Sequence, residues 1–513
     1  MTLAGVAASC GRTGLFVPPP PQPVTAGPDA SAVDAASEPP SGASDVRGQV
    51  IAHYTWDTGV ADEGVDLTGV TIEAFAELAQ GGFAAVQGSG GTDGRFVVPQ
   101  MPDGAFLLLV GMTVLVHPAR DVTLPVYVAG RPDSTMEGPG IEVNLDVLGL
   151  APWEQQDPPI FQLQIFSSNA GCEASVFGFQ PPPPVGATEL TGVLGNINTW
   201  VGIDAMKGDR ATLGQYDVQS SSRRLVRTLD LPSPELTGPV GAIQGTFEAV
   251  APDQQATISW DFPAFQSYLA QLAPGAQGTS ANASIEAYAN TLQPALAPYL
   301  FFLPIREQRP GSVGATLVGG SRNAWSGAPI ALSFGNPFPG WSEWVSIYLQ
   351  ASATTSIPDD EGGTTSTLLI GDVAHFGPIS ALGTHPLEPR LTPPSDVRID
   401  GADAFAGAGQ VSASPTFTWT PAKSLDPQFD GGTIDYVLTV SPVFSSAIAP
   451  DSGRAQPQQL YFFTSDPRVT IPPQLLTPGS TYLASIMTRA VAGPDLSNPA
   501  VDSVGISTAP FSR

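Results

Sequence analysis

The sequence predicts a mainly β protein, a multidomain chain of β-sandwiches with a few short helices in its middle region. The chain has 513 residues, which is too long for one hydrophobic core, and 42% of them are apolar, enough to fill several cores. Its 55 glycines and 53 prolines favour short strands and turns over long helices. Several segments also alternate apolar with polar residues, which is the pattern of a strand with one face in solvent.

The charge of the chain argues against one class of partner. Lys and Arg number 20 against 47 Asp and Glu, so the formal net charge is −27. The longest basic cluster is Arg223 and Arg224 with Arg227 nearby, which is too small to offset repulsion from a phosphate backbone. We therefore expect no nucleic-acid partner and an acidic, solvated surface.

The first ten residues, MTLAGVAASC, are small and apolar and end at Cys10. They resemble the end of a bacterial lipoprotein signal peptide, in which small residues precede the cysteine that becomes lipidated. No Lys or Arg precedes Cys10, and the segment is short for a charged region plus an apolar core, which a start codon placed too far downstream would explain. The resemblance implies lipidation at Cys10, a lipid as membrane anchor, and a place in the cell envelope, as an outer membrane lipoprotein or at the cell surface. The alternative is an Ala-rich terminus with an ordinary cysteine.

Residues 11–45 predict a disordered tether. The segment contains four consecutive prolines at 18–21 and few large apolar side chains, so it cannot bury enough surface to fold. Its prolines keep it extended. Beyond it, no apolar run reaches the length of about 18 residues that a membrane-spanning helix needs.

Cys172 is the other cysteine of the chain. Two cysteines cannot form a disulfide framework, and no histidine lies near Cys172 in the sequence. We expect Cys172 to be a small buried hydrophobic residue rather than a nucleophile.

Strand-like segments and glycine-centred turns alternate from 46 to 117, including TDGRF at 92–96 and PDGAF at 102–106. This order resembles the carboxypeptidase regulatory-like domain, a small transthyretin-like β-sandwich, although the TDGRF element is two residues shorter than usual. The resemblance implies that Gly94 takes a positive φ, that Phe96 fills the core and that Asp93 caps the loop. A calcium ligand is the alternative for Asp93, but the turn holds no second acidic residue at ligand spacing. No other cofactor is expected.

The middle region, 118–392, resembles no characterised family. Alternation predicts strands at 141–147, 161–165 and 257–262, and three- to four-residue spacing of apolar residues predicts helices at 263–273 and 284–299. The region is long enough for two subdomains or one large sandwich, and the sequence places no internal boundary.

The last segment, 393–513, contains PTFTW at 415–419 and LTPGSTY at 476–482. These elements resemble a fibronectin type III domain, an immunoglobulin-like β-sandwich. The resemblance implies that Trp419 lies in the core and that the Tyr482 hydroxyl bonds nearby backbone. The stretch between Val440 and Val469 is longer than usual for the family.

No catalytic set emerges from the sequence. The four histidines, His53, His117, His375 and His385, lack the spacing of a zinc site, and we expect no metal ligands and no catalytic residues. The glycine-rich stretch 88–94 lacks the lysine and helix of a phosphate loop, and GWSEW at 340–344 lacks the last glycine of a nucleophile elbow. A hydrolase in the middle region stays an alternative, because two placed carboxylates suffice for a glycosidase.

One segment suggests a binding surface. In the strand expected at 344–350, Val345, Ile347 and Leu349 share one face, and Trp344 and Tyr348 share the other. If the aliphatic face is the core, Trp344 and Tyr348 form an exposed aromatic strip that could stack on a polysaccharide or an envelope protein. The alternative is that a neighbouring sheet covers the strip.

Taken together, these features favour a non-enzymatic, surface-exposed bacterial envelope lipoprotein with structural or binding β-sandwich modules. A carbohydrate-binding or adhesive protein is the first alternative, and the hydrolase is the second. Both families that the chain resembles serve as accessory modules in many proteins, so the resemblances do not decide among these functions.

Overall fold

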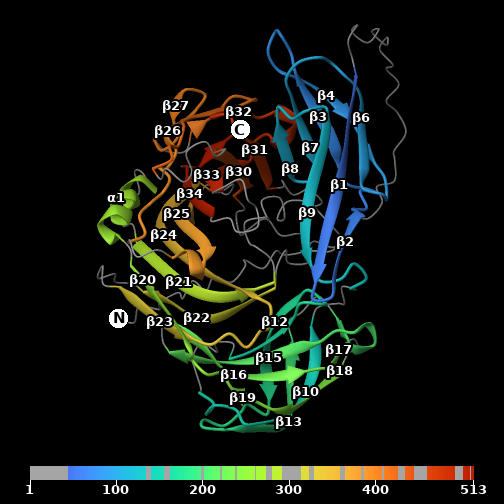
Figure 1. The fold of residues 1–513 in the computed structure, drawn as a ribbon. Helices are drawn as coiled ribbons and strands as arrows, with labels where there is room; N and C mark the ends of the chain where they lie inside the picture. Colours follow the sequence, from blue (N-terminus) through green and yellow to red (C-terminus); the bar gives the residue numbers. More distant parts are fainter. Residues whose placement is uncertain are drawn as a thin grey trace. The chain divides into compact units, whose positions relative to one another are not determined.

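The computed structural model describes residues 44–513 with the exception of 135–139, 155–161, 198–201, 220–221, 237–239, 260, 273–279, 292–312, 323–328, 359–363, 383–385, 407–408, 426–433, 444–458, 492–500 and 509. Cys10 and all but the last two residues of the expected tether lie outside this part of the chain. Strands dominate the described residues (Figure 1), so the prediction of a mainly β fold is confirmed. None of the helices found there is long and apolar enough to cross a membrane.

We divide the described chain into four modules. The first module is a sandwich whose two sheets have the strand orders β2-β1-β6-β5, with β9 beside β1, and β4-β3-β7-β8. Its strands are β1 Ser44–Trp56, β2 Gly59–Gly64, β3 Ile72–Glu77, β4 Phe83–Gln87, β5 Ser89–Gly90, β6 Arg95–Met101, β7 Phe106–Val110, β8 Thr113–Val116 and β9 Asp121–Ala129. Strand β9 lies beyond the expected segment 46–117 and contributes Leu124, Val126 and Val128 to the core. The module therefore extends to Ala129.

The second module encloses a core of its own between residues 141 and 247. Its main strands pair in the order β18-β10-β13-β12-β11-β15-β16. Its elements are β10 Ile141–Leu148, β11 Leu163–Ser167, β12 Cys172–Gln180, β13 Glu189–Ile197, β14 Ile203–Asp204, η1 Ala205–Lys207, β15 Ala211–Gln219, β16 Ser222–Leu231, β17 Glu235–Leu236, β18 Val240–Thr246 and β19 Glu248–Ala249. This separate core divides the middle region at a point that the sequence did not reveal.

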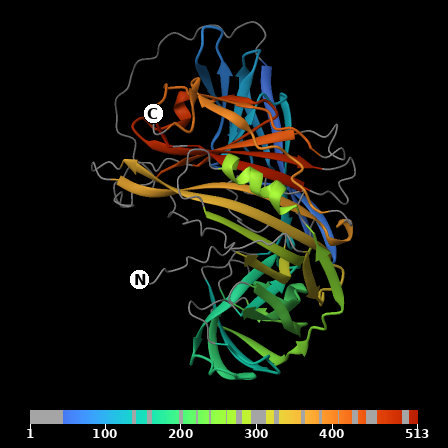
Figure 2. The same cartoon turned by 90° about the vertical axis from the view of Figure 1, so that its left-hand side faces the viewer.

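The third module holds the one α-helix of the described residues. Its elements are β20 Gln254–Ile258, α1 Phe262–Leu272, β21 Ser280–Asn290, β22 Gly314–Arg322, β23 Ile330–Phe334, β24 Ser342–Pro358, β25 Thr364–Pro378 and η3 Ile379–Ala381. Helix α1 confirms the prediction at 263–273, and it packs near β24, β25 and β34 (Figure 2). The helix predicted at 284–299 is wrong for residues 284–290. Ile285, Ala287 and Ala289 alternate into the core because β21 pairs with β22 and β24, and residues from 292 lie outside the described chain.

The fourth module is a sandwich with one sheet in the order β27-β26-β29-β32 and another in which β31, β30, β33 and β34 pair in that order. Its elements are β26 Ser395–Ile399, β27 Ala402–Asp403, β28 Gly409–Gln410, β29 Thr416–Thr420, β30 Ile434–Pro442, β31 Leu460–Thr464, β32 Arg468–Thr470, η6 Pro473–Leu475, β33 Thr481–Val491, β34 Val501–Ser507 and β35 Phe511–Ser512. Trp419 and Tyr482 are both buried in its core, as expected for Trp419.

Strand pairing joins modules that are far apart in the sequence. Strand β16 pairs with β22, which links the second module to the third, and β25 pairs with β34, which links the third to the fourth. Strand β31 pairs with β8 in parallel, which links the fourth module back to the first (Figure 1). One large cluster of buried hydrophobic residues accordingly includes side chains from all four modules.

Candidate functional site

The contact between the first and fourth modules contains a candidate site. Strand β7, FLLLV, is buried along its whole length because the core of the first module covers one of its faces and the cluster shared with the fourth module covers the other. Phe106, Leu108 and Val110 point into the core of the module, and Leu107 and Leu109 join the cluster shared with the fourth module. An uninterrupted apolar run of this kind is the sequence signal of a strand covered on both sides.

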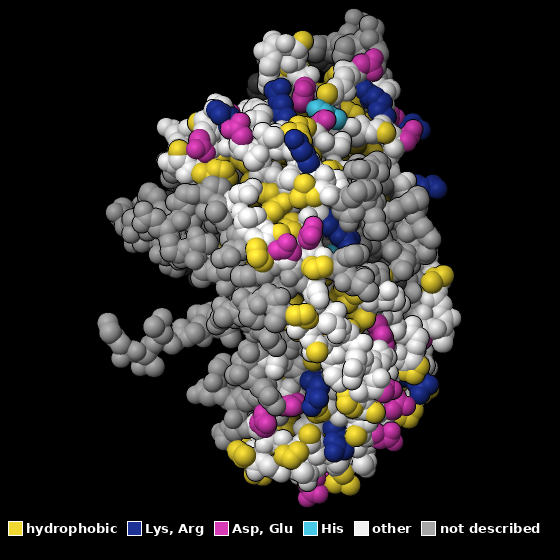
Figure 3. Space-filling model, turned by 60° about the vertical axis from the view of Figure 1, so that its left-hand side comes forward, with side chains coloured by type: hydrophobic (Ala, Val, Ile, Leu, Met, Phe, Trp, Pro, Cys, Tyr) yellow, Lys and Arg dark blue, Asp and Glu magenta, His cyan; other side chains and the backbone are white. Residues whose placement is uncertain are grey.

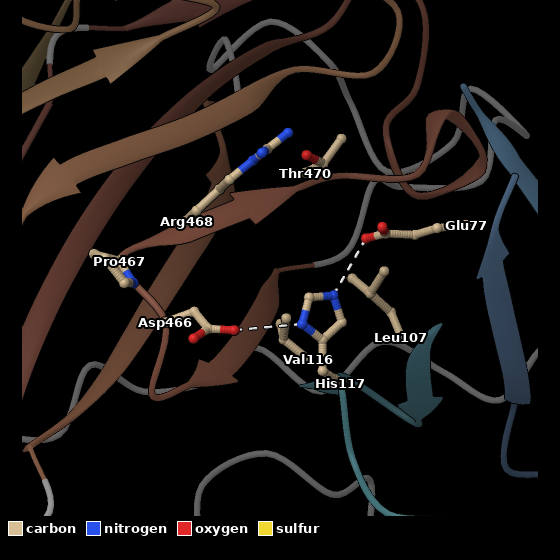
Figure 4. A pocket seen from close by; sticks show the side chains of 8 residues that line it. All are labelled: Glu77, Leu107, Val116, His117, Asp466, Pro467, Arg468 and Thr470. Carbon is tan, nitrogen blue, oxygen red and sulfur yellow. Dashed lines mark hydrogen bonds and ion pairs between the residues drawn. The ribbon is translucent and has the colours of Figure 1, made fainter. Parts of the chain in front are cut away.

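A cleft of about 300 Å³ opens at the rim of this contact (Figure 4). His117, which directly follows β8, lies between two carboxylates. Its Nε2 is 3.3 Å from Oε1 of Glu77 at the end of β3, and its Nδ1 is 3.4 Å from Oδ2 of Asp466 in the turn between β31 and β32. The φ of His117 is 50°, a conformation that few non-glycine residues adopt. The imidazole of His117 thus connects Glu77 of the first module with Asp466 of the fourth.

The protonation state of the imidazole decides how many of these contacts are hydrogen bonds. A neutral imidazole has one N–H, so it can donate to only one carboxylate, whereas an imidazolium donates to both. The side chains of His117, Glu77 and Asp466 are 39%, 43% and 59% exposed. Ion pairs this exposed contribute roughly 0–1 kcal/mol. Burying one leucine contributes about 1.5–3 kcal/mol, so the apolar contact dominates this joint.

The cleft does not assemble an acid, a base and a nucleophile. Thr470 Oγ1 is engaged with Thr416 Oγ1 at 3.0 Å, and the Arg468 side chain is directed away from the imidazole (Figure 4). The two carboxylates lie at opposite nitrogens of His117, so the three groups do not converge on one point. Across the described residues, no group of three or more His, Cys, Asp or Glu side chains could hold a metal ion.

The joint between the first and second modules contains a buried ion pair. Arg131 Nε donates to Asp209 Oδ1 at 2.8 Å and Nη2 donates to Oδ2 at 2.6 Å, while Nη1 donates to Asp133 at 2.6 Å. The side chains of Arg131 and Asp209 are 8% and 0% exposed. Burial alone would lower the pKa of Arg131, but the bonds to the two carboxylates raise it above its ordinary value. The guanidinium therefore stays charged inside the joint.

Backbone contacts complete the same joint. The Arg131 N–H donates to the carbonyl of Asn169 at 2.8 Å, and the Asp57 N–H donates to Oδ1 of Asn169 at 3.0 Å. Gly171 has a φ of 72°, and a Cβ there would lie 2.1 Å from the carbonyl oxygen of Ala129. Only glycine fits at this position, because the two modules meet backbone to backbone.

The expectation of an exposed aromatic strip is wrong for Trp344. Val345, Ile347 and Leu349 do form a core face, but Trp344 on the opposite face is 1% exposed and Tyr348 is half-buried. Strand β24 lies between β21 and β25, with Trp344 opposite Tyr288 on one side and Pro378 on the other. Trp344 is a buried residue of a central strand, so the two aromatic rings do not form an open binding strip.

The other residues selected from the sequence are placed as follows. Cys172 is 1% exposed in the core of the second module, which confirms it as a buried hydrophobic residue. His53 is 2.6 Å from Asp62 and stacks on Tyr127, whereas His375 lies half-buried in β25 and His385 lies outside the described residues. Neither His53 nor His375 lines the cleft at His117.

The turn residues behave as the two resemblances implied. Gly94 has a φ of 79°, Phe96 is 4% exposed in the core, and Asp93 Oδ1 accepts the Arg95 N–H at 3.1 Å, which caps the loop. The Tyr482 hydroxyl accepts the Thr477 N–H at 2.7 Å. The predicted roles of these residues are confirmed.

Sequence reasoning missed the residues that hold the modules together. Leu107 and Leu109 had a local signal, since a strand buried on one face would carry polar residues at those positions. Arg131 and Asp209 had none, because residues 78 positions apart meet only when the modules pack.

Comparisons with known proteins add little to this description. No family model and no curated protein matches the chain. Among solved structures, the chain is similar to a tetra-tandem repeat in the extending region of a large adhesion protein, with 11% identity, 90% of this chain and 99% of that chain covered, and a TM-score of 0.11. It is also similar to the native conformation of E. coli alpha-2-macroglobulin, with 11% identity, 92% of this chain and 28% of that chain covered, and a TM-score of 0.11. At these TM-scores neither similarity carries an argument about function.

Proposed function

We propose that the protein is a non-enzymatic, surface-exposed lipoprotein of the bacterial envelope, in which four β modules act as one stiff structural unit. The observation that carries this proposal is the cyclic order of the module contacts, in which the first module touches the second, the second the third, the third the fourth, and the fourth the first. Domains joined by small polar contacts move relative to one another. Three of these four joints use strand pairing, the fourth uses a buried ion pair, and all modules share one apolar cluster.

The proposal assigns each part of the chain a task. Cys10 carries the lipid, residues 11–45 hold the body away from the membrane, and the modules present their outer faces to the surroundings. The first module is a carboxypeptidase regulatory-like sandwich and the fourth is a fibronectin type III-like sandwich. The positive φ of Gly94 and the bond between Tyr482 and Thr477 support these two assignments.

The anchoring claim is tested with the protein expressed from its native gene in its own host, comparing the wild type with Cys10→Ala. We expect the wild type to gain the mass of attached lipid and to partition into membranes, and the variant to lose both. Cys172→Ala is the matched control, because a buried core cysteine has no role in anchoring. Unmodified, freely soluble protein from the wild-type gene would refute the anchor.

The stiffness claim has its own test. Val60 of the first module and Leu425 of the fourth are exposed, so both can carry spin labels. We expect pulsed electron paramagnetic resonance to give one narrow distribution of the distance between the two labels. A broad distribution in the wild-type protein would show that the joints flex and would refute the scaffold role.

A further inference from the structure

The sheet of the second module curls until its two end strands, β18 and β16, approach each other along a seam. At one end of this seam the strands are joined, because β19 follows β18 almost directly and pairs antiparallel with β16, with Ala249 opposite Arg227. A Cβ at Gly245 would lie 2.6 Å from Leu229 Cδ1, so β18 itself still touches β16 there. The seam is therefore closed at the end where β18 runs into β19.

The seam opens toward the start of β18, and two prolines account for the opening. The antiparallel register of β19 and β16, continued along the chain, would place Gln244 opposite Pro232 and Ala242 opposite Pro234. Proline has no N–H, so neither proline can donate a hydrogen bond to a neighbouring strand. Of the described strands, only β10 pairs with β18. The second side of β18 is thus left without a partner strand.

A groove of about 850 Å³ occupies the open part of the seam. Val240, Gly241, Ala242 and Gln244 line one side of it, and the segment 230–234 lines the other. A strand with one neighbour directs the N–H and C=O groups of alternate residues to its free side. No hydrogen bond to another described residue engages the backbone of β18 on this side. The groove therefore exposes a strand edge whose backbone groups can pair with a further strand.

The inner and outer sides of the groove differ in chemistry. On the inner side, Leu231 lines the groove and is buried. On the outer side, Glu142 and Asp146 project from β10, beside β18, and both are exposed. No ion pair or hydrogen bond with a described residue occupies either carboxylate, whereas Asp230 in the groove is 3.1 Å from Arg210. The groove is thus apolar within and carries two unpaired carboxylates at its outer rim.

The charge around the seam favours a cationic partner. None of the described residues that line the groove is Lys or Arg. Figure 3 shows further acidic side chains over the lower part of the molecule, where the second module lies. Two copies of this chain, each with a formal charge of −27, repel each other, which disfavours a second copy as the occupant.

The open strand edge selects an extended protein segment as the occupant. A row of alternating N–H and C=O groups pairs with another backbone, and such strand addition is a recurring mode of peptide recognition. Successive side chains of an added strand point to opposite faces. A segment that alternates apolar and basic residues would therefore turn its apolar side chains toward Leu231 and its basic ones toward Glu142 and Asp146.

We propose that β18 binds an extended segment of a partner protein, in which basic and apolar residues alternate, as an added strand in the seam between β18 and residues 230–234. The backbone of the segment pairs with the free edge of β18, and its basic side chains lie near Glu142 and Asp146. This inference goes beyond the structural role proposed above and does not depend on lipidation of Cys10.

The test uses the purified full-length chain and a synthetic peptide in which lysine and valine alternate over the length of β18. We expect one peptide to bind each chain, measured by calorimetry at low ionic strength, where charges are weakly screened. Amide hydrogen exchange is expected to slow in residues 240–244 when the peptide is bound. Absence of binding, or slower exchange only outside β18, would overturn the proposal.

Two methylated peptides test the backbone pairing. One carries methyl groups on the backbone nitrogens of its lysines, and the other carries them on those of its valines. Alternate residues of a strand direct their N–H groups to the same side, so in one of the two peptides the methyl groups face β18 and block pairing. We expect that peptide to bind about tenfold more weakly, or weaker still, than the unmethylated one. Equal binding of all three peptides would show that charge alone attracts them and would overturn the proposal.

Charge variants test the position of the peptide. Glu142→Gln combined with Asp146→Asn is expected to weaken binding about three- to tenfold. The matched control combines Glu63→Gln with Asp253→Asn, which removes the same charge from exposed residues outside the second module and leaves the affinity near that of the wild type. Equal losses of affinity in the two double variants would mean that net charge, and not this seam, attracts the peptide. Circular dichroism of each variant separates loss of binding from loss of folding.

Light scattering of the chain without peptide tests whether a second copy occupies the seam. We expect a monomer. A dimer that the peptide dissociates would show that the edge of β18 pairs with another copy of the chain, which would overturn the proposal of a cationic partner.

Discussion

The guanidinium of Arg131 and the carboxylate of Asp209 form a two-point ion pair, with N–O distances of 2.8 and 2.6 Å, inside the joint between the first and second modules. The two charges are almost completely removed from water. Asp209 Oδ2 also accepts the Asp204 N–H at 2.8 Å, so the carboxylate is held by partners from two directions. A pair of this kind contributes little over an apolar contact but is costly to break, since one charge would remain buried alone.

The first prediction concerns this pair. Asp209→Asn leaves the buried Arg131 with Asp133 as its remaining carboxylate partner, and we expect a loss of about 3–5 kcal/mol in unfolding free energy. Urea denaturation followed by tryptophan fluorescence measures the change. Arg210→Ala is the control because it breaks an ion pair whose two side chains are each 63% exposed, and it should cost less than about 1 kcal/mol. Equal losses of unfolding free energy in the two variants would contradict the conclusion that Arg131 and Asp209 form a buried ion pair.

The second prediction concerns the backbone contact at Gly171. An alanine there must adopt a φ of 72° and place its Cβ 2.1 Å from the Ala129 carbonyl oxygen, so the two modules must separate. Gly186→Ala is the matched control, since its φ of 81° carries similar strain but a Cβ would meet nothing within 4 Å. We expect the unfolding free energy to fall by about 1–2 kcal/mol in the control. In Gly171→Ala we expect it to fall by about 1–3 kcal/mol more than in the control, measured by thermal unfolding. Similar losses of unfolding free energy in the two variants would mean that the backbones at Gly171 and Ala129 can move apart at little cost.

The third prediction ranks the contributions to the joint between the first and fourth modules. Leu109→Ala removes a buried leucine from the shared core and is expected to cost about 2–5 kcal/mol. His117→Ala removes two exposed polar contacts and is expected to cost about 1 kcal/mol or less. Amide hydrogen exchange at β8 and β31 measures both, and faster exchange in the histidine variant than in the leucine variant would reverse the ranking.

The fourth prediction is a pH dependence. Burial raises the pKa of Asp372 from 3.8 to about 6, so the folded state binds its proton more tightly than the unfolded state does. The stability that protonated Asp372 contributes is therefore fully present below about pH 4 and is lost as the pH rises through 6. Asp372→Asn should raise stability at pH 7.5 by about 1–3 kcal/mol, the lower part of the range reflecting the residue's partial burial, and should not do so at pH 3.5.

Denaturation curves of wild type and variant across pH 3.5–8 measure this difference. The control Asp253→Asn replaces an exposed carboxylate and should leave the pH profile of stability unchanged. A stability difference between Asp372→Asn and wild type that is independent of pH would show that the carboxyl group is well solvated.

Local sequence signals were enough for features that depend on neighbouring residues. The turn at Gly94, the strand at β10, the helix α1 and the bond from Thr477 to Tyr482 each arise from short segments whose pattern or glycine specifies the backbone. The helix expected from residue 284 was wrong because apolar residues at Ile285 and Tyr288 fit a three- to four-residue spacing, yet the neighbouring strands β22 and β24 fix the segment as β21. Tertiary pairing overrode a weak local preference.

The sequence by itself therefore determined the fold class, the turns, the identity of many core residues and the resemblance of Cys10 to a lipidation site. Only the tertiary structure decided that Trp344 is covered, that β9 belongs to the first module, and that Leu107 and Leu109 pack in the core shared with the fourth module. Hydrophobic alternation specifies which side of a strand faces a core. It carries no information about which other strand or module covers the opposite side, because that depends on contacts between residues tens to hundreds of positions apart.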